Sequence, residues 1–360
     1  MNERIGILTG GGDCPGLNTV IAAVVRAAAR RGWETVGFIG GFEGLLSPVE
    51  YRVLDFHQME DVRFEGGTIL KTSNRGRFAA KVGHGEAKRI PAEILDQARQ
   101  SFEALRLRAL VCVGGDGSLS IAQQLFEHGV PLVGVPKTID NDLDATAMTF
   151  GFDTAVATAT DALDRLRTTA ESHDRVMLLE VMGRYAGWIA VYAGMAGGAD
   201  VILIPEVPFS YDSVCSKIAE RERAGLHYSL VVVAEGATER GGEFVVAAEE
   251  ATDREARLGG ISARVSREIA RRTSKETREC VLGHLQRGGM PTNFDRALCT
   301  MFGTEAVALI ADERYGRMVA FAPPQMTSVP IAEAVGRLRR VDLQGNLVRS
   351  ARALGICLGD

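Results

Sequence analysis

Short apolar runs alternate with amphipathic stretches along the first part of the chain. The runs RIGILTG, ETVGFIG, ALVCVGG and VPLVGVP have the character of buried strands that end at glycine or proline. Helical spacing follows the first run at residues 17–31, with Ile21, Val24 and Ala28 on one face, and SLSIAQQLFEHG predicts a helix that stops at Gly129. This alternation predicts a parallel sheet with helices on both faces and ligands beyond the carboxyl ends of its strands.

A second series of the same kind begins after Gly151. It opens with a helix from Asp153 to Arg167, and RVMLLEVMG, ADVILIPE and YSLVVVAEG supply further strands. AGWIAVYAGMAGG and the residues from Ser213 to Ala224 have helical patterns. We therefore expect an α/β protein with two lobes, divided near residue 151.

Composition and charge narrow the possible partners. The 360 residues are 46% hydrophobic and 24% charged, with a net charge of −5, so nothing favours nucleic acid or an anionic membrane as partner. Six cysteines without a C-x-x-C pair indicate reduced thiols rather than a zinc site. No apolar run approaches the roughly 20 residues that span a bilayer, and the start of the chain lacks a signal-peptide pattern. A cytoplasmic protein is expected.

Two glycine-rich turns join a strand to a helix. TGGGDCPGLN and VGGDGSLS place glycines where backbone amides approach an anion at a helix N-terminus, although neither matches the dinucleotide or Walker patterns. The alternative is that the glycines only make tight turns. Asp116 in the second turn suits a magnesium ligand beside phosphates. Asp13 in the first turn could equally be a helix cap.

The segment VPKTIDND follows the third strand at the same predicted sheet edge. Phosphoryl transfer to an alcohol needs a base, donors for the moving oxygens and a metal. Asp140 is a candidate base, Thr138 a donor to the phosphoryl group, and Asp142 an orienting carboxylate. An Asx-rich turn would explain Asn141 and one aspartate, but not the neighbouring cation and hydroxyl together.

Eight ordered motifs carry a family resemblance. GGGDCPGLN, GGTILKTSNR, GGDGS, PKTIDND, FGFDTA, EVMGRYAGW, VVAEG and VLGHLQRGG occur in the order and approximate spacing of the phosphofructokinases, from residue 4 to about residue 310. The chain thus resembles this family, whose fold is two doubly wound α/β lobes with mainly parallel sheets. The resemblance implies a donor lobe of residues 1–151 and about 288–335, and a sugar-phosphate lobe of about 152–287 and 336–360.

The resemblance also implies roles for residues of the donor lobe and the catalytic loop. Asp140 would take the proton from the 1-hydroxyl of fructose 6-phosphate, while Thr138 and Arg184 stabilise the phosphoryl group in transfer. Asp116 would bind Mg²⁺. The remaining donor-binding residues implied by the family are Gly12, Arg75, Gly115, Gly117 and Ser118.

The family's sugar-phosphate site maps onto the second half of the chain. Its members here would be Met182, Gly183, Glu235, His284 and Arg287. Arg175 and Arg278 match arginines that reach into a neighbouring subunit's site, which implies a homo-oligomer, either a dimer or a tetramer.

Two positions bear on the phosphoryl donor, which in this family is ATP or pyrophosphate. Gly117 is typical of ATP users, whereas Lys137 is typical of pyrophosphate users. We expect ATP, because an aspartate at position 117 would repel the α-phosphate, while a flexible lysine can swing aside or bind a product phosphate. The alternatives are a pyrophosphate-dependent enzyme, a kinase of NAD or lipids, a non-catalytic nucleotide-binding module, and a different acceptor such as sedoheptulose 7-phosphate.

Overall fold

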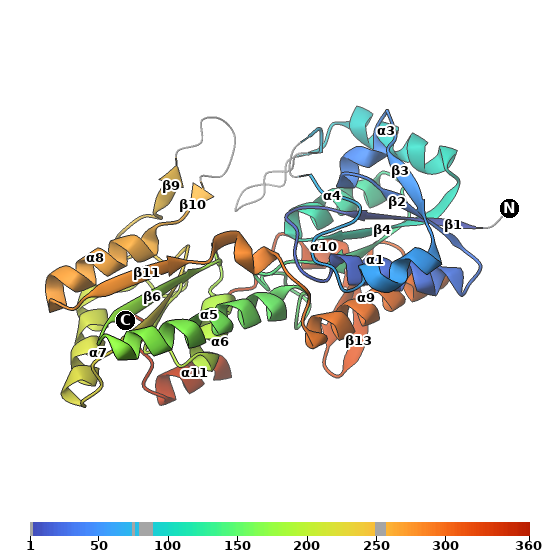
Figure 1. Cartoon of the computed structure of the whole chain (residues 1–360). Coiled ribbons are helices and arrows are strands. Elements are labelled where there is room, and N and C mark those ends of the chain that lie inside the picture. The colour runs from blue at the N-terminus through green and yellow to red at the C-terminus, as the bar shows by residue number, and fades with distance from the viewer. Residues whose placement is uncertain (1–2, 74–75, 79–88, 249–256) are drawn as a thin grey trace. The chain divides into compact units, whose positions relative to one another are not determined.

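The computed structural model describes residues 3–73, 76–78, 89–248 and 257–360. The chain forms two compact units, whose elements are labelled in Figure 1. The first unit contains Met1–Ile139, Leu143–Thr154 and Arg287–Leu338, and the second contains Asp140–Asp142, Ala155–Gln286 and Arg339–Asp360. Both units hold mainly parallel sheets covered by helices, so the predicted α/β fold class is confirmed.

The first unit is built on a seven-stranded sheet in the order β13-β12-β5-β4-β1-β2-β3. The inner strands are parallel, and the two edge strands β3 and β13 run antiparallel to their neighbours. The strands are β1 (Arg4–Thr9), β2 (Glu34–Phe38), β3 (Tyr51–Leu54), β4 (Leu107–Gly114), β5 (Leu132–Pro136), β12 (Arg317–Ala322) and β13 (Gln325–Pro330). The four apolar runs of the amino-terminal half are thus strands, as the sequence predicts.

Helices cover both faces of this sheet. In Figure 1, α1 (Leu17–Ala29) and α9 (Asn293–Ala311) lie on one face, while α3 (Ala92–Ala104) and α4 (Asp116–Glu127) lie on the other. Because side chains alternate along a strand, β1 supplies both layers, and Leu8 joins the core under α3 and α4. The predicted helix SLSIAQQLFEHG begins at Asp116 rather than at Ser118, since the second glycine turn leads directly into it.

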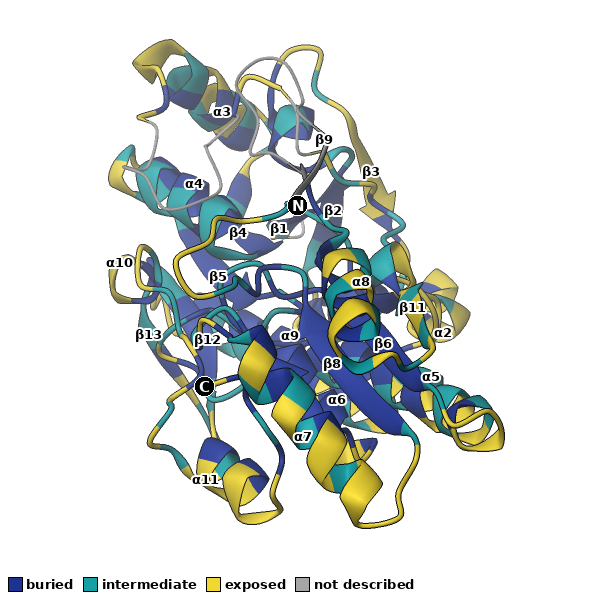
Figure 2. Ribbon diagram, turned by 90° about the vertical axis from the view of Figure 1, so that its left-hand side faces the viewer, coloured by how far each residue is buried: buried dark blue, intermediate teal, exposed yellow. Residues whose placement is uncertain are grey.

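The second unit has a four-stranded parallel sheet in the order β11-β6-β8-β7. Its strands are β6 (Val176–Val181), β7 (Val201–Leu203), β8 (Ser229–Ala234) and β11 (Thr277–Val281), and its main helices are α5 (Phe152–Ser172), α6 (Trp188–Ala196), α7 (Tyr211–Arg223) and α8 (Ile261–Thr273). Apolar residues of α7 and α8 pack on the sheet face that carries Leu178 and Val231. Figure 2 shows buried strands beneath helices whose outer faces are exposed.

The remaining elements are short. They are η1 (Gly41–Leu45), η2 (Phe56–Gln58), α2 (Met59–Val62), β9 (Val246–Ala248), β10 (Arg257–Leu258), η3 (Gly283–Arg287), α10 (Ile331–Ala334) and α11 (Asn346–Ala353). None of the helices in the described ranges combines the length and apolarity that crossing a membrane would require.

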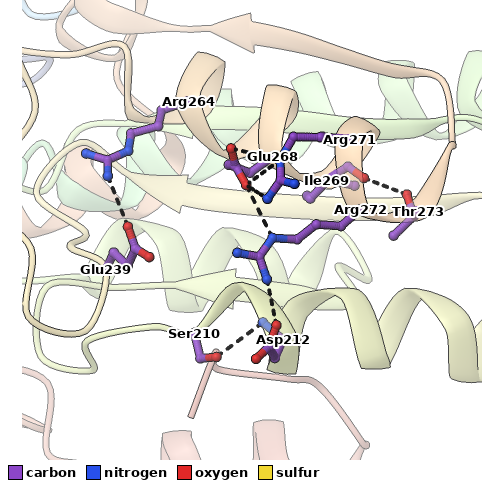
Figure 3. Close-up of polar contacts among 9 residues, drawn as sticks. All are labelled: Ser210, Asp212, Glu239, Arg264, Glu268, Ile269, Arg271, Arg272 and Thr273. Carbon is purple, nitrogen blue, oxygen red and sulfur yellow. Dashed lines mark hydrogen bonds and ion pairs between the residues drawn. The ribbon is translucent and has the colours of Figure 1, made fainter.

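A charged network fastens α8 to α7 (Figure 3). Arg272 contacts Glu268 one turn earlier on α8 at 3.2 Å and Asp212 on α7 at 2.6 Å. Its guanidinium also lies 5.1 Å from the ring centroid of Tyr211. Because these groups are partly exposed, the network orients the two helices and adds only about 1 kcal/mol or less per ion pair.

A buried carboxylate caps the start of α5 in the first unit. Asp295 is 0% exposed and accepts hydrogen bonds from the backbone of Gly151 and Thr154, both at 2.9 Å, and from the Thr154 hydroxyl at 2.5 Å. Burial raises the pKa of Asp295 to about 6. Thr292 caps α9 by accepting from the Asp295 amide, so the two helix starts are fixed by one set of side chains.

We expect Asp295→Ala to lower the free energy of unfolding by about 3 kcal/mol, because it leaves three buried donors without their acceptor. Urea denaturation at neutral pH measures the change. Thr304→Ala, at an exposed position of the same helix, is the matched control and should change stability by less than about 0.5 kcal/mol. Equal losses in the two variants would contradict the capping role.

Candidate active site

Three loops of the first unit meet at one sheet edge. They follow β1, β4 and β5, which are adjacent and parallel, so their carboxyl ends point the same way. The Gly10 amide donates to the Val113 carbonyl at 2.8 Å, and the Lys137 amide donates to the Gly114 carbonyl at 3.0 Å. Both glycine-rich turns and the start of the TIDND loop therefore lie together, as the strand pattern predicts.

The two turns approach so closely that only glycine fits at key positions. A Cβ atom at Gly114 would lie 2.2 Å from the Cβ of Ser118, and one at Gly10 would lie 2.7 Å from its hydroxyl oxygen. Ser118 is 8% exposed and occupies the space that these glycines leave open. The glycines thus do more than turn the chain. Because they have no Cβ, the backbone of both turns can pack against the buried Ser118 hydroxyl.

Neither helix that follows a glycine turn has a side-chain cap. The first residue before α1 is Gly16, with φ of 105°, and the residue before α4 is Gly115. The alternative that Asp13 caps α1 is therefore wrong. Amide groups at such helix starts favour an anionic ligand, because the helix dipole and the N–H groups act together.

Lys137 is a fixed part of this edge. Its side chain is buried, with 4% of the residue exposed, and its Nζ donates to the Gly12 carbonyl oxygen. A Cβ at Gly11 would lie 3.2 Å from the same Nζ. The expectation of a flexible lysine that swings aside is wrong, because a buried ammonium needs nearby acceptors and finds one in the turn.

Asp116 begins α4 at the same edge. Its Oδ1 accepts a hydrogen bond from the Gly336 amide at 2.9 Å. No cluster of three or more His, Cys, Asp or Glu side chains suited to a metal occurs in the part of the chain that the structure describes. A single carboxylate such as Asp116 is a donor set that Mg²⁺ takes when substrate oxygens and water complete its shell.

Arg75 and Arg287 are the arginines predicted for the donor site and the sugar-phosphate site. Arg75 lies outside the described residues. Arg287 belongs to η3, and its Nη1 donates to the Asp13 carbonyl oxygen at 3.2 Å. A Cβ at Gly12 would come within 3.0 Å of this guanidinium. The side chain thus lies against the first glycine turn within the first unit.

The second unit has its own cluster at the carboxyl ends of β6 and β8, which are parallel neighbours. The Glu235 amide donates to the Val181 carbonyl at 2.8 Å, and the Gly236 amide donates to the Gly183 carbonyl at 3.2 Å. A Cβ at Gly236 would lie 1.9 Å from the Arg184 carbonyl oxygen. The turn from Met182 to Arg184 and the predicted Glu235 are therefore brought together.

Gln286 is a residue of this cluster that sequence reasoning missed. It is 0% exposed, and its Oε1 accepts from the Met182 amide at 3.2 Å. The signal in the sequence was its place between His284 and Arg287 in HLQRGG, two residues already predicted to belong to the site. A buried amide side chain there needs hydrogen-bond partners, so Gln286 could have been expected to fix a neighbouring backbone. Gln286 fixes the backbone of the Met182 turn, whereas His284 is exposed.

Glu235 holds a proton unusually tightly. Burial raises its pKa from the ordinary 4.5 to about 7, and the charges of Asp140 and Glu180 add to the effect. A hydrogen bond from the Gly183 backbone and the charge of Arg184 act in the opposite direction. Asp140 is thus an electrostatic neighbour of Glu235 within the second unit.

The two arginines predicted to serve a neighbouring subunit contact one carboxylate in this chain. Arg175 lies 2.9 Å from Glu276, and Arg278 lies 2.5 Å from the same residue. Arg278 lies in β11, the edge strand of the second unit's sheet, and Arg175 directly precedes the neighbouring strand β6. Their reach into another subunit stays a prediction.

A sequence profile described as phosphofructokinase matches residues 4–310. The chain belongs to the phosphofructokinase family. It is 51% identical over 358 residues to the ATP-dependent 6-phosphofructokinase of Chloroflexus aurantiacus, covering 99% of this chain and 98% of that one. It is also 48% identical over 340 residues to the pyrophosphate–fructose 6-phosphate 1-phosphotransferase of Amycolatopsis methanolica, covering 94% and 96%.

Solved phosphofructokinase structures share the fold. Phosphofructokinase from Pichia pastoris in the T-state superposes with a TM-score of 0.81 at 27% identity. The match covers 99% of this phosphofructokinase chain and 37% of the Pichia chain, so the present chain spans less than half of that longer protein. The family resemblance inferred from the eight motifs is confirmed.

We expect Glu235→Gln to flatten part of the pH dependence of stability. Between pH 4.5 and about 7 the folded protein holds a proton on Glu235 that the unfolded chain has released. The contribution of this residue to the free energy of unfolding therefore falls as pH rises through that window. Urea denaturation of wild type and variant at several pH values measures the difference.

Glu243→Gln, at an exposed position of the same unit, is the control for this experiment. The free energy of unfolding of wild type minus that of Glu235→Gln should fall as pH rises, so that the variant gains stability relative to wild type. The same difference for the control should stay flat. A flat difference for Glu235→Gln as well would show that its pKa is ordinary.

Proposed function

We propose that this chain is an ATP-dependent 6-phosphofructokinase, which transfers a phosphoryl group from MgATP to the 1-hydroxyl of fructose 6-phosphate. The observation that carries the proposal is the assembly of the GGGD turn, the GGDG turn and the PKTIDND loop at one edge of three adjacent strands. The 51% identity to a full-length ATP-dependent enzyme supports the same reaction.

The first unit supplies the donor half of the reaction. Helix starts after Gly16 and Gly115 present amides to the phosphates, and the buried Ser118 hydroxyl lies beneath the turns. Asp116 would hold the Mg²⁺ ion, which neutralises charge on the donor phosphates when it is bound. Gly117, beside Asp116, leaves room where an aspartate would repel the α-phosphate.

The second unit supplies the acceptor half. The turn from Met182 to Arg184, Glu235 and His284 of this unit would bind the sugar phosphate. The family resemblance adds Arg287, which belongs to the first unit. Asp140 takes the proton of the 1-hydroxyl as the oxygen forms its bond to the γ-phosphorus, and the bond between the γ-phosphorus and the bridging oxygen breaks to release ADP. Thr138 and Arg184 donate hydrogen bonds to the transferring oxygens.

Lys137 bears on the choice of donor. Its Nζ is held by the Gly12 carbonyl, so the cation stays at the first glycine turn. A cation fixed there serves the terminal phosphates of either donor, and it therefore does not exclude ATP. The pyrophosphate-dependent reaction is the second candidate, because a relative with that name is 48% identical over 340 residues.

Purified protein with fructose 6-phosphate and Mg²⁺ should form fructose 1,6-bisphosphate with ATP and not with pyrophosphate. Gly117→Asp should lower kcat/KM for ATP at least about tenfold, because it adds a like charge and bulk near the α-phosphate. Gln100→Glu, at an exposed position of α3, is the control for adding a carboxylate to the same unit. Turnover with pyrophosphate alone would overturn the ATP assignment.

We expect Asp140→Asn to lower kcat by about 10²–10⁴-fold while leaving the KM for ATP nearly unchanged, because it removes a general base without removing a donor contact. Asp144→Asn, a few residues further along the chain, is the control for losing one carboxylate nearby. Coupled-enzyme kinetics at saturating substrate measure both variants. A loss of less than threefold would assign the base to another group.

Oligomerisation and acceptor choice are further parts of the proposal. Arg278 lies in the edge strand β11 and Arg175 directly precedes the adjacent strand β6, and we propose that both arginines complete the site of a neighbouring copy in a homo-oligomer. The predicted pocket recognises mainly the phosphate end of the sugar, so sedoheptulose 7-phosphate is the acceptor to compare with fructose 6-phosphate.

A further inference from the structure

Residues 336–341, with the sequence GRLRRV, form a segment that we call the C-terminal strap. The strap lies beyond residue 310, where the family match ends. It begins in the last segment of the first unit, which ends at Leu338, and continues into the last segment of the second unit, which starts at Arg339. Its hydrogen bonds reach two aspartate-bearing loops, and each bond lies within one unit.

In the first unit the strap holds Asp116. The Gly336 amide donates to Oδ1 of this carboxylate at 2.9 Å. Gly336 makes this hydrogen bond in a left-handed conformation, with φ of 75°. Two residues later, Leu338 forms an antiparallel bridge with Leu143, directly after the TIDND motif. A carboxylate fixed through one oxygen keeps the other oriented for a cation, as outer-shell partners of metal ligands commonly do.

In the second unit the strap holds the TIDND loop. The Arg339 amide donates to the carbonyl oxygen of Asp142 at 2.8 Å, two residues after Asp140. The carbonyl of Arg339 accepts from Nε1 of Trp188 at 3.0 Å, and its guanidinium lies 4.7 Å from the centroid of the same ring. Trp188 is 8% exposed, so this anchor is well packed.

The anchor is itself attached to the start of α6. The Val341 amide donates to Oε1 of Glu206 at 2.9 Å, and this carboxylate also accepts from the Gly187 amide at 3.1 Å. Gly187 directly precedes α6, whose first residue is Trp188. Arg339 and Val341 of the strap are therefore both bonded to the start of α6, one directly through Trp188 and the other through Glu206.

We propose that the C-terminal strap is a positioning element for phosphoryl transfer, in which Gly336 orients Asp116 and Arg339 orients the loop that bears Asp140. This proposal rests on the proposed function. The strap residues are positioning residues, because their backbone groups bond to Asp116 and to the loop that bears Asp140. Displacing a reacting group by about 1 Å can lower the rate about a hundredfold. Contacts that hold Asp116 and the loop of Asp140 in place therefore affect catalysis.

The first test uses Gly336→Ala, which strains a backbone with φ of 75° without a steric clash, since a Cβ there meets nothing within 4 Å. Gly225→Ala is the matched control, because Gly225 has φ of 80°, the same open surroundings and no contact with the strap. Electron paramagnetic resonance with Mn²⁺ and ADP measures metal binding directly. We expect affinity about tenfold weaker in Gly336→Ala and unchanged in Gly225→Ala.

The second test uses Trp188→Phe, which keeps a ring under Arg339 but removes the hydrogen bond to its carbonyl. We expect kcat to fall about tenfold with both KM values within twofold, because the base loop is loosened and the substrate contacts stay. Trp33→Phe is the control, since Trp33 also lies under an arginine, with Arg108 at 5.1 Å from its ring. It should keep the wild-type kcat.

A spectroscopic readout separates the strap from the reaction. The chain has two tryptophans, so Trp188 is the only source of tryptophan emission in Trp33→Phe protein. Adding Gly336→Ala should shift this emission to longer wavelength, and adding Gly225→Ala should not. If wild type lacks phosphofructokinase activity but these Mn²⁺ and emission changes occur, the proposed function fails, and the result supports only the positioning of Asp116 by the strap. If wild type is active and Gly336→Ala matches Gly225→Ala in both readouts, the strap proposal is overturned.

Discussion

The close approach of backbone at the carboxyl ends of β1 and β4 is the constraint on which the rest of the first unit's site depends. Gly10 and Gly114 can have no Cβ there, because Ser118 already fills the space. The crowding leaves the following helices to start at glycines without side-chain caps. Their amides, together with the buried ammonium of Lys137, create a positive region in a chain whose net charge is −5.

The local parts of this arrangement could be predicted from the sequence. Apolar runs that end at glycine located the strands, and the order of strand and helix placed the two turns and the TIDND loop at one edge. The motifs then identified the family. The roles proposed for Asp116, Thr138 and Asp140 follow from residue type and position along the chain, and they stay predictions.

Other features could not be predicted because they depend on distant segments. Whether Lys137 is flexible or buried depends on the Gly12 carbonyl, 125 positions away. The cap provided by Asp295 lies 141 positions from Thr154. The pKa of Glu235 depends on burial and on Asp140, neither of which a linear pattern reveals. Contacts between residues far apart in the sequence decide these properties. Local secondary-structure propensity carries no information about such contacts.

The order in which the segments occur along the chain has a consequence for synthesis on the ribosome. The first unit's sheet takes β12 and β13 from residues 317–330, and α9 covers a face that α1 alone cannot close. Nascent chains that end before residue 287 therefore carry an unfinished first unit with apolar surface exposed, while most of the second unit has already emerged. Early binding of a chaperone to the face beside α1 would protect the growing chain until about its last fifth is made.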